Sequence, residues 1–207
     1  MKTKFYVPAF ILLFGAMLTA FTLAPQGDGY DVGDTVSDFS LKNIDGKMVS
    51  LADYKNAKGF IVSFTGNHCP YAKLYEQRTI DLHNKFASKG YPVIAINPND
   101  PVKAPDDSYA KMQERAKEKG FPFAYLFDET QEIAKAFGAT RTPHVYILKK
   151  EGNDMKVKYI GAIDDNPKNG EDATEFYVSS AVDALLQGQE IKKTHTKAIG
   201  CTIKWKE

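Results

Sequence analysis

Short apolar runs alternate with longer amphipathic segments along most of this chain. Runs of four to six mostly apolar residues are typical of buried β-strands, and such runs occupy 59–64, 93–96 and 123–127. Each run is followed by a segment with helical spacing, at 71–88, 108–120 and 130–137. These segments end at a glycine or within two residues of one, and glycine is a common helix-ending residue. The first predicted helix has an apolar face made of Tyr71, Leu74, Tyr75, Leu82 and Phe86.

Two hairpins and a last helix complete the pattern. The hairpins pair 39–41 with 48–51 and 145–148 with 156–160, and the helix covers 176–186. This order predicts an α/β fold with a central mixed sheet flanked by helices and an N-terminal β-hairpin extension. We expect one domain over 32–188 and a polar tail over 189–207.

The N-terminus follows a different pattern. Lys2 and Lys4 precede the apolar run 7–21, and small residues follow it, which is typical of a signal peptide. We therefore expect residues 1–24 to direct export to the periplasm or another extracytoplasmic space. The alternative is an uncleaved membrane anchor formed by 5–24, since the run is near the lower length limit for a span. Membrane contact is expected only in that case.

Charge narrows the possible partners. The chain holds 27 Lys and Arg residues against 26 Asp and Glu, for a net charge of +1. Such a balance offers no basic field for nucleic acid, so no nucleic-acid partner is expected. No haem, flavin or nucleotide motif is visible, and we expect no cofactor.

Cys69 is the main candidate for chemistry. It follows the strand at 59–64 and a short turn, and Pro70 then opens a helix. A helix N-terminus stabilises a thiolate through its free N–H groups and dipole, which makes the sulfur nucleophilic at neutral pH. The only other cysteine is Cys201, 132 positions later. In an exported protein the two could form a redox-active disulfide or a purely structural one, or could stay unpaired.

A second candidate segment is Thr142-Pro143-His144, directly before a predicted strand. The Thr142–Pro143 bond could be cis, which would turn backbone groups outward. His68 and His144 could each be a positive neighbour of the thiol, a proton donor or an ordinary loop residue. Arg78 could be a charge partner near the site or an ordinary helix residue.

The chain resembles the thioredoxin superfamily, in the redoxin or peroxiredoxin-like (AhpC/TSA-like) branch. The segments that carry the resemblance are 37–47, 64–73, 95–100, 120–131, 136–143 and 199–205. The resemblance implies a thioredoxin-like fold in which Cys69 matches the first cysteine of a Cys-x-x-Cys site and Pro143 the facing cis-proline. Pro70 and Tyr71 resemble the intervening residues that tune the thiolate in periplasmic disulfide oxidases.

The chain also departs from these relatives. The second cysteine position of Cys-x-x-Cys is Ala72, and Ser63 replaces the buried carboxylate of thioredoxins. At the offsets of the peroxiredoxin threonine and proline stand Gly66 and Val62. The attacking cysteine of peroxiredoxins also aligns with Ala72. The resemblance therefore points to a subfamily with a single cysteine at the site, in which only Cys201 could resolve Cys69.

We expect an exported thiol–disulfide oxidoreductase or antioxidant redoxin with Cys69 and Cys201 as catalytic residues. Thr142 and Pro143 would present backbone groups to an extended substrate. Its partners would be a protein disulfide or a peroxide, together with an external thiol reductant. The alternative is a non-catalytic binding module with a structural disulfide, or with copper or another soft metal on Cys69, His144 and Cys201 or His195. No metal is expected under the first hypothesis.

Overall fold

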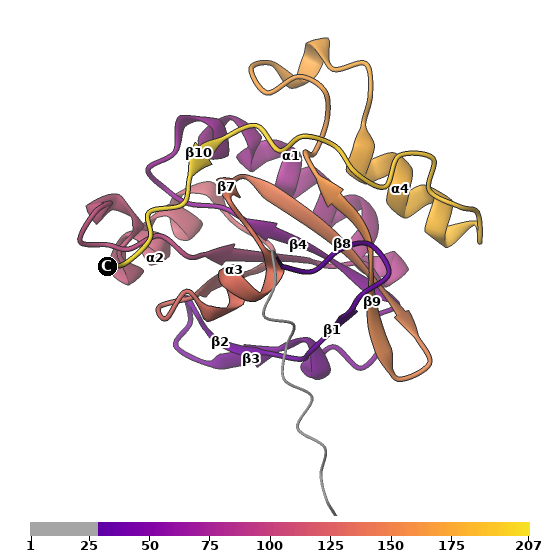
Figure 1. Cartoon of the computed structure of the whole chain (residues 1–207). Coiled ribbons are helices and arrows are strands. Elements are labelled where there is room, and N and C mark those ends of the chain that lie inside the picture. The colour runs from indigo at the N-terminus through magenta and orange to yellow at the C-terminus, as the bar shows by residue number, and fades with distance from the viewer. Residues whose placement is uncertain (1–28) are drawn as a thin grey trace, which may run out of the picture.

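The structure is a computed structural model, and it describes residues 29–207 (Figure 1). The segment 1–24, expected to be a signal peptide or an anchor, lies outside the described residues. Within 29–207, none of the helices has the length and apolar character needed to cross a membrane.

Eight strands form one mixed sheet in the order β1-β9-β8-β4-β5-β6-β2-β3. Strands β4, β5 and β6 run parallel, whereas β8 lies antiparallel to β4 and pairs with β9. The hairpin β2–β3 extends the sheet beyond β6. The strands are β1 (Thr35–Val36), β2 (Ser40–Asn43), β3 (Met48–Ser50), β4 (Gly59–Phe64), β5 (Val93–Asn97), β6 (Ala124–Phe127), β8 (His144–Glu151) and β9 (Asp154–Gly161).

Helices cover both faces of this sheet, as predicted. The helices α1 (Pro70–Phe86), α2 (Tyr109–Lys119) and α4 (Tyr177–Leu186) pack on one face, and α3 (Glu132–Phe137) packs on the other. Alternation along β4 explains the two cores, because Phe60 and Val62 face α3 while Ile61 faces α1. The short 3-10 turns are η1 (Leu51–Asp53), η2 (Ala87–Lys89), η3 (Pro105–Asp107) and η4 (Gly170–Asp172). The predicted mixed sheet with an N-terminal hairpin is confirmed.

The predicted inner face of the first helix is partly wrong. Leu74 is 49% exposed, whereas Ala72 is buried together with Tyr75, Leu82 and Phe86. Leu74 lies about 100° around the helix from Tyr75, so it falls outside the stripe that faces the sheet. The predicted helix endings hold better, because Gly90, Gly120 and Gly138 all adopt the left-handed conformation at their caps.

The tail forms regular structure that the sequence did not predict. After α4 it runs back across the molecule, shown in yellow in Figure 1, to β10 (Cys201–Thr202). This strand pairs antiparallel with β7 (Arg141–Thr142), with Cys201 opposite Thr142. Cys201 is thereby placed beside Cys69 at the start of α1.

Candidate active site

Cys69 is the N-cap residue of α1, and Pro70 is the first helical residue. Proline suits this position because its missing N–H would have no partner inside the helix. Cys69 has no exposed surface, while Tyr71 in the first turn is half-buried. The predicted order of strand, turn, cysteine and helix is confirmed.

Cys69 and Cys201 form a disulfide with their Cα atoms 5.9 Å apart. The unpaired alternative is therefore wrong, and neither cysteine is free. Cys201 remains half-buried, whereas Cys69 is completely covered. The two sides of the bond therefore differ in their access to solvent.

Thr142 and Pro143 face the disulfide, and the bond between them is cis. The Cys69 sulfur lies 3.0 Å from the carbonyl oxygen of Thr142. A disulfide sulfur carries no hydrogen, so this contact becomes a hydrogen bond only when Cys69 is a reduced thiol. The backbone edge that we expected to receive an extended substrate is filled by β10 of the same chain.

Side chains from two loops hold the tail in this position. The Lys204 N–H donates to Asn99 Oδ1 at 2.9 Å, and the Lys204 carbonyl accepts from Gln131 Nε2 at 2.9 Å. Gln131 Oε1 also accepts from the Lys206 N–H at 2.7 Å. Ile203 is buried in the core under α3. The tail is thus bound downstream of Cys201 by contacts that do not need the disulfide.

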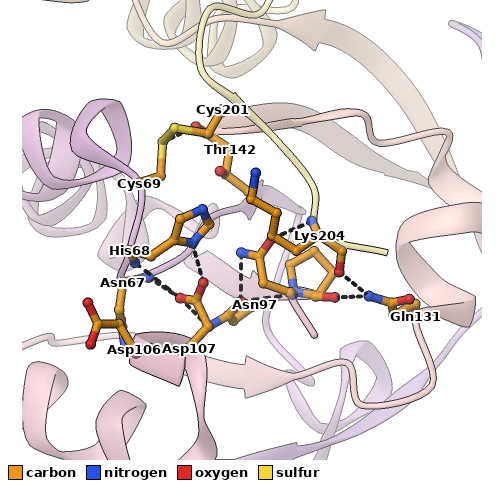
Figure 2. A network of polar contacts seen from close by, with 12 residues as sticks. Asn67, His68, Cys69, Asn97, Asp106, Asp107, Gln131, Thr142, Cys201 and Lys204 are labelled. Carbon is orange, nitrogen blue, oxygen red and sulfur yellow. Dashed lines mark hydrogen bonds and ion pairs between the residues drawn. A yellow bond between two sulfur atoms is a disulfide. The ribbon is translucent and has the colours of Figure 1, made fainter. Parts of the chain in front are cut away.

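A buried carboxylate, Asp107, lies next to the cysteine turn (Figure 2). It ends η3 and accepts from the backbone N–H groups of Asn67 and His68 and from Asn97 Nδ2. His68 Nδ1 bonds its second oxygen. The carboxylate therefore fixes both the turn and the imidazole that precede Cys69. Sequence reasoning missed Asp107, because a Pro- and Asp-rich loop gives no signal for which carboxylate is buried.

Further bonds hold the turn itself. Tyr125 on β6 donates its hydroxyl to Asn67 Oδ1 at 2.9 Å, and Asn67 Nδ2 donates to the Asp106 carbonyl at 2.8 Å. A Cβ atom at Gly66 would overlap the side-chain amide of Asn99. The lack of a side chain at the position of the peroxiredoxin threonine thus has a steric reason.

Two buried side-chain atoms have no hydrogen-bond partner among residues 29–207, His68 Nε2 and Thr142 Oγ1. Both belong to residues beside the disulfide. In Figure 2 one edge of the His68 ring faces Asp107, and its other nitrogen points toward the side of Cys69 and Thr142. Among residues 29–207, the buried side-chain atoms that lack a hydrogen bond are therefore found at this site.

His144 does not supply a positive charge at neutral pH. Burial lowers the pKa of His144 to about 4, and the ring packs against Tyr146 with centroids 4.9 Å apart. Its Nδ1 accepts from the Thr140 N–H at 3.4 Å, which leaves the ring neutral. The interpretation of His144 as a cationic neighbour of the thiol is therefore wrong at pH 7.

Arg78 forms an ion pair away from the sulfur. Its guanidinium contacts Asp164 at 2.7 Å and lies over the Tyr75 ring, 3.7 Å from its centroid. Arg78 follows Cys69 by about 2.5 helical turns, so its ion pair joins α1 to the loop after β9 and does not reach the sulfur. Ser63 is buried in β4 and brings no carboxylate to the site.

The alternative metal ligands are not brought together. Across the part of the chain that the structure describes, no group of three or more His, Cys, Asp or Glu residues could hold a metal ion. His195 Nε2 bonds Asp31 at 2.7 Å, and its backbone bridges to Ile160. The two thiols that would bind a soft metal are bonded to each other.

Comparison with known proteins places this site in a family. The model of the AhpC/TSA family matches residues 32–160. The chain belongs to the AhpC/TSA family. Cys201 lies outside the matched region, so the tail cysteine is an addition to the part that defines the family.

Individual proteins agree with this assignment. Thiol-disulfide oxidoreductase ResA of Bacillus cereus is 26% identical over 156 residues, covering 73% of this chain and 85% of that protein. The crystal structure of an uncharacterised conserved protein from Geobacillus kaustophilus is 39% identical with a TM-score of 0.78, covering 89% and 94%. That of peroxidoxin BcpB from Mycobacterium tuberculosis is 20% identical with a TM-score of 0.56, covering 76% and 96%.

These findings confirm the predicted redoxin of the thioredoxin superfamily and its thioredoxin-like fold. The family and the named relative also bear out the predicted enzyme class, a thiol oxidoreductase or peroxiredoxin-like enzyme. The roles of the individual site residues stay predictions.

Proposed function

We propose that this protein is an exported thiol–disulfide oxidoreductase or antioxidant redoxin in which Cys69 is the nucleophile and Cys201 resolves it. The observation that carries the proposal is the disulfide between the helix-start cysteine and the tail, opposite Thr142. A sulfur at a helix N-terminus is the position that favours a thiolate. Pro70, Tyr71 and His68 would support Cys69, and Thr142, Pro143 and His144 would line the opposite side.

The reaction balances with two thiols and one substrate disulfide. The Cys69 thiolate attacks one sulfur of the substrate, and the other substrate sulfur leaves with the electron pair. The Cys201 thiolate then attacks the Cys69 sulfur and releases the second substrate thiolate. The substrate gains two electrons and two protons, and the protein becomes the Cys69–Cys201 disulfide.

A peroxide would lead to the same product. The Cys69 thiolate would take one peroxide oxygen to form a sulfenic acid while the other leaves as water or alcohol, and Cys201 would then displace water. Gly66 and Val62 stand at the peroxiredoxin positions for threonine and proline, which favours disulfide exchange over this route.

Burial sets the direction from which the oxidised form can be reduced. Cys69 is covered, so an external thiolate reaches the half-buried Cys201 first. Attack at Cys201 expels Cys69 as a thiolate at the helix N-terminus, the better leaving group of the two. A second external thiolate then attacks the reductant's own sulfur in the mixed disulfide, so that Cys201 leaves as a thiolate and the oxidised reductant is released.

Export rests on the sequence and the chemistry together. Residues 1–24 have the pattern of a signal peptide, with 5–24 as the alternative anchor, and a disulfide persists best outside the cytoplasm. The proposed mature protein has the redoxin domain over 32–188 and the tail over 189–207, in the periplasm or another extracytoplasmic space.

The test compares Cys69→Ser, Cys201→Ser and the double variant in disulfide reduction and in peroxide turnover. We expect Cys69→Ser to lose turnover completely and Cys201→Ser to accumulate mixed disulfides with substrate. Full turnover in Cys69→Ser would end the proposal. A reduction potential of about −120 to −270 mV would fit a working oxidoreductase, and one below about −300 mV would indicate the structural disulfide instead.

A further inference from the structure

The oxidised site leaves polar atoms unsatisfied in a way that points to another state. His68 Nε2 and Thr142 Oγ1 are the buried side-chain atoms without a partner among residues 29–207, and both residues adjoin the disulfide. A buried polar atom without a hydrogen bond costs free energy, and a neutral disulfide sulfur is a weak partner. A reduced Cys69, with a thiol proton or a negative charge, would give His68 Nε2 the partner that it lacks.

Asp107 decides what His68 can do. The carboxylate is fully buried and bonds His68 Nδ1, so the proton of the neutral ring lies on Nδ1 and Nε2 is free to accept another. The other donors to Asp107 are neutral, namely two backbone N–H groups and the Asn97 amide. Among these contacts His68 is the only group that can carry a positive charge opposite the buried carboxylate.

We propose that His68, held by Asp107, is the proton acceptor for Cys69. This rests on the proposed function, since it concerns the reduced form of the same cysteine. The Cys69 S–H bond breaks, its electron pair stays on sulfur, and the proton moves to His68 Nε2. The resulting imidazolium faces the thiolate on one side and Asp107 on the other. When an external thiol cleaves the disulfide, its own S–H proton can move to His68 Nε2, so that an imidazolium again faces Cys69 as it leaves as a thiolate.

The Thr142 carbonyl is the reason that a Cys69 thiolate needs a positive charge nearby. It lies 3.0 Å from the Cys69 sulfur, where it would accept from a thiol but repel a thiolate. Ser63 brings no charge from β4, and the neutral His144 brings none from β8. The other charged or titratable groups around His68 and its turn are Asp106 on η3, Tyr125 on β6, and Glu76 on α1 paired with Arg115 on α2.

The experiment follows thiolate absorbance near 240 nm against pH in the Cys201→Ser protein, where Cys69 is the only cysteine. This optical readout needs no reagent to reach the buried sulfur. We compare the parent with His68→Gln, Asp107→Asn and, as the matched control, Asp106→Asn. The side chain of Asp106 is exposed, and only its backbone carbonyl takes part in the turn.

We expect the midpoint of thiolate formation to rise by about one pH unit or more in His68→Gln and in Asp107→Asn, about a tenfold loss of thiolate at low pH. Combining both changes should add little to either alone, because the two residues act as a unit. Asp106→Asn should titrate like the parent. Equal midpoints in parent and His68→Gln would overturn the inference.

Further results distinguish a variant that does not fold, a wrong proton acceptor and a wrong proposed function. If Asp107→Asn does not fold, which thermal unfolding would reveal, His68→Gln decides, since Gln keeps a polar side chain of similar reach. If Cys69→Ser loses turnover while His68→Gln titrates like the parent, the oxidoreductase stands and only the proton acceptor is wrong. Full turnover in Cys69→Ser would instead remove the proposed function itself.

Discussion

The two halves of the disulfide are built differently. Cys69 belongs to the fixed half: it lies between β4 and α1, has no exposed surface, and follows a turn held by Asp107. Cys201 belongs to the attached half: it lies on a two-residue strand, stays half-buried, and is reached by the chain only after α4. One sulfur is part of the core, and the other is brought to it.

This difference teaches how a redoxin site without a second cysteine can still form a disulfide. The position that would carry the resolving thiol, Ala72, is buried in the first turn of α1. The tail brings a cysteine to the opposite side, along the backbone edge of β7. The edge that binds substrate in our sequence-based hypothesis is thereby filled by the chain's own strand.

The largest effect is expected from Gly200→Ala, which tests whether the attached half needs its close contact with β7 to bring Cys201 to Cys69. A Cβ at this position would overlap the Thr142 carbonyl, which is backbone and cannot move aside without disturbing β7. We expect the tail to lose its register, so that after exposure to an oxidant both cysteines remain thiols, which alkylation and mass spectrometry detect. The control is Thr202→Ala, an exposed neighbour on the same strand. A disulfide formed as completely in Gly200→Ala as in the parent would contradict the assigned contact.

The second test concerns the fixed half and uses pH. Burial lowers the pKa of His144 to about 4 against about 6.5 when unfolded, so between these values the unfolded chain binds more protons. The contribution of the neutral His144 to the free energy of unfolding is fully present above about pH 6.5. It is lost as the pH falls toward 4, and the loss is about 2 kcal/mol at pH 5.

His144→Gln should remove this part of the pH dependence. The measurement is urea unfolding of the oxidised protein and the variant at pH 8 and pH 5. Asp128, whose pKa is raised by burial, acts with the opposite sign in both proteins and cancels in the difference. Equal losses on acidification in the two proteins would show that His144 is charged or exposed in the folded state.

The smallest expected effect is on the anchor of the attached half. Gln131→Ala removes the side-chain bonds to Lys204 and Lys206, worth about 1 kcal/mol net. Reduction of the disulfide by dithiothreitol should then be about fivefold faster, since the tail opens more often. Glu132→Gln, a change in an exposed neighbour, should leave the rate as it was. An unchanged rate of reduction in Gln131→Ala would show that Ile203 holds the tail without the hydrogen bonds of Gln131.

Gln131→Gly distinguishes the loss of the side-chain hydrogen bonds from the effect of backbone strain at this position. Gln131 has φ of +64°, a conformation that glycine adopts without strain. The glycine variant should therefore lose the same bonds but recover part of the folded-state stability, measured by urea unfolding. A glycine variant less stable than the alanine variant would contradict strain at this position.

Periodic and local signals predicted most of the fold. The apolar runs predicted β4, β5 and β6, and glycines predicted the ends of α2 and α3 and of the 3-10 turn η2 that follows α1. The strands β1, β7 and β10 were missed, because two residues carry no periodicity. Such strands exist only where a neighbouring backbone is already in place to pair with them.

The site was predictable where chemistry is tied to a motif and not where it depends on distant packing. Cys69 and Pro70 follow from a strand, a turn and a helix start, and Pro143 from its place before a strand together with the family resemblance. Asp107 does not, since its loop is 40 residues from Asn67 and only folding brings them together. The neutral state of His144 likewise depends on burial, which no local pattern shows.

The disulfide also changes what a cut in the chain means. It joins residues 132 positions apart, so α1, α2, α3, α4 and four of the eight sheet strands, β5, β6, β8 and β9, lie inside one covalent ring. A protease that nicks a surface loop anywhere in that ring opens it without releasing a fragment. The nicked protein keeps its mass on a non-reducing gel and separates into two pieces only when a reductant is present. Damage to this protein would therefore stay hidden until the same reducing equivalents that the site is proposed to use reach Cys201.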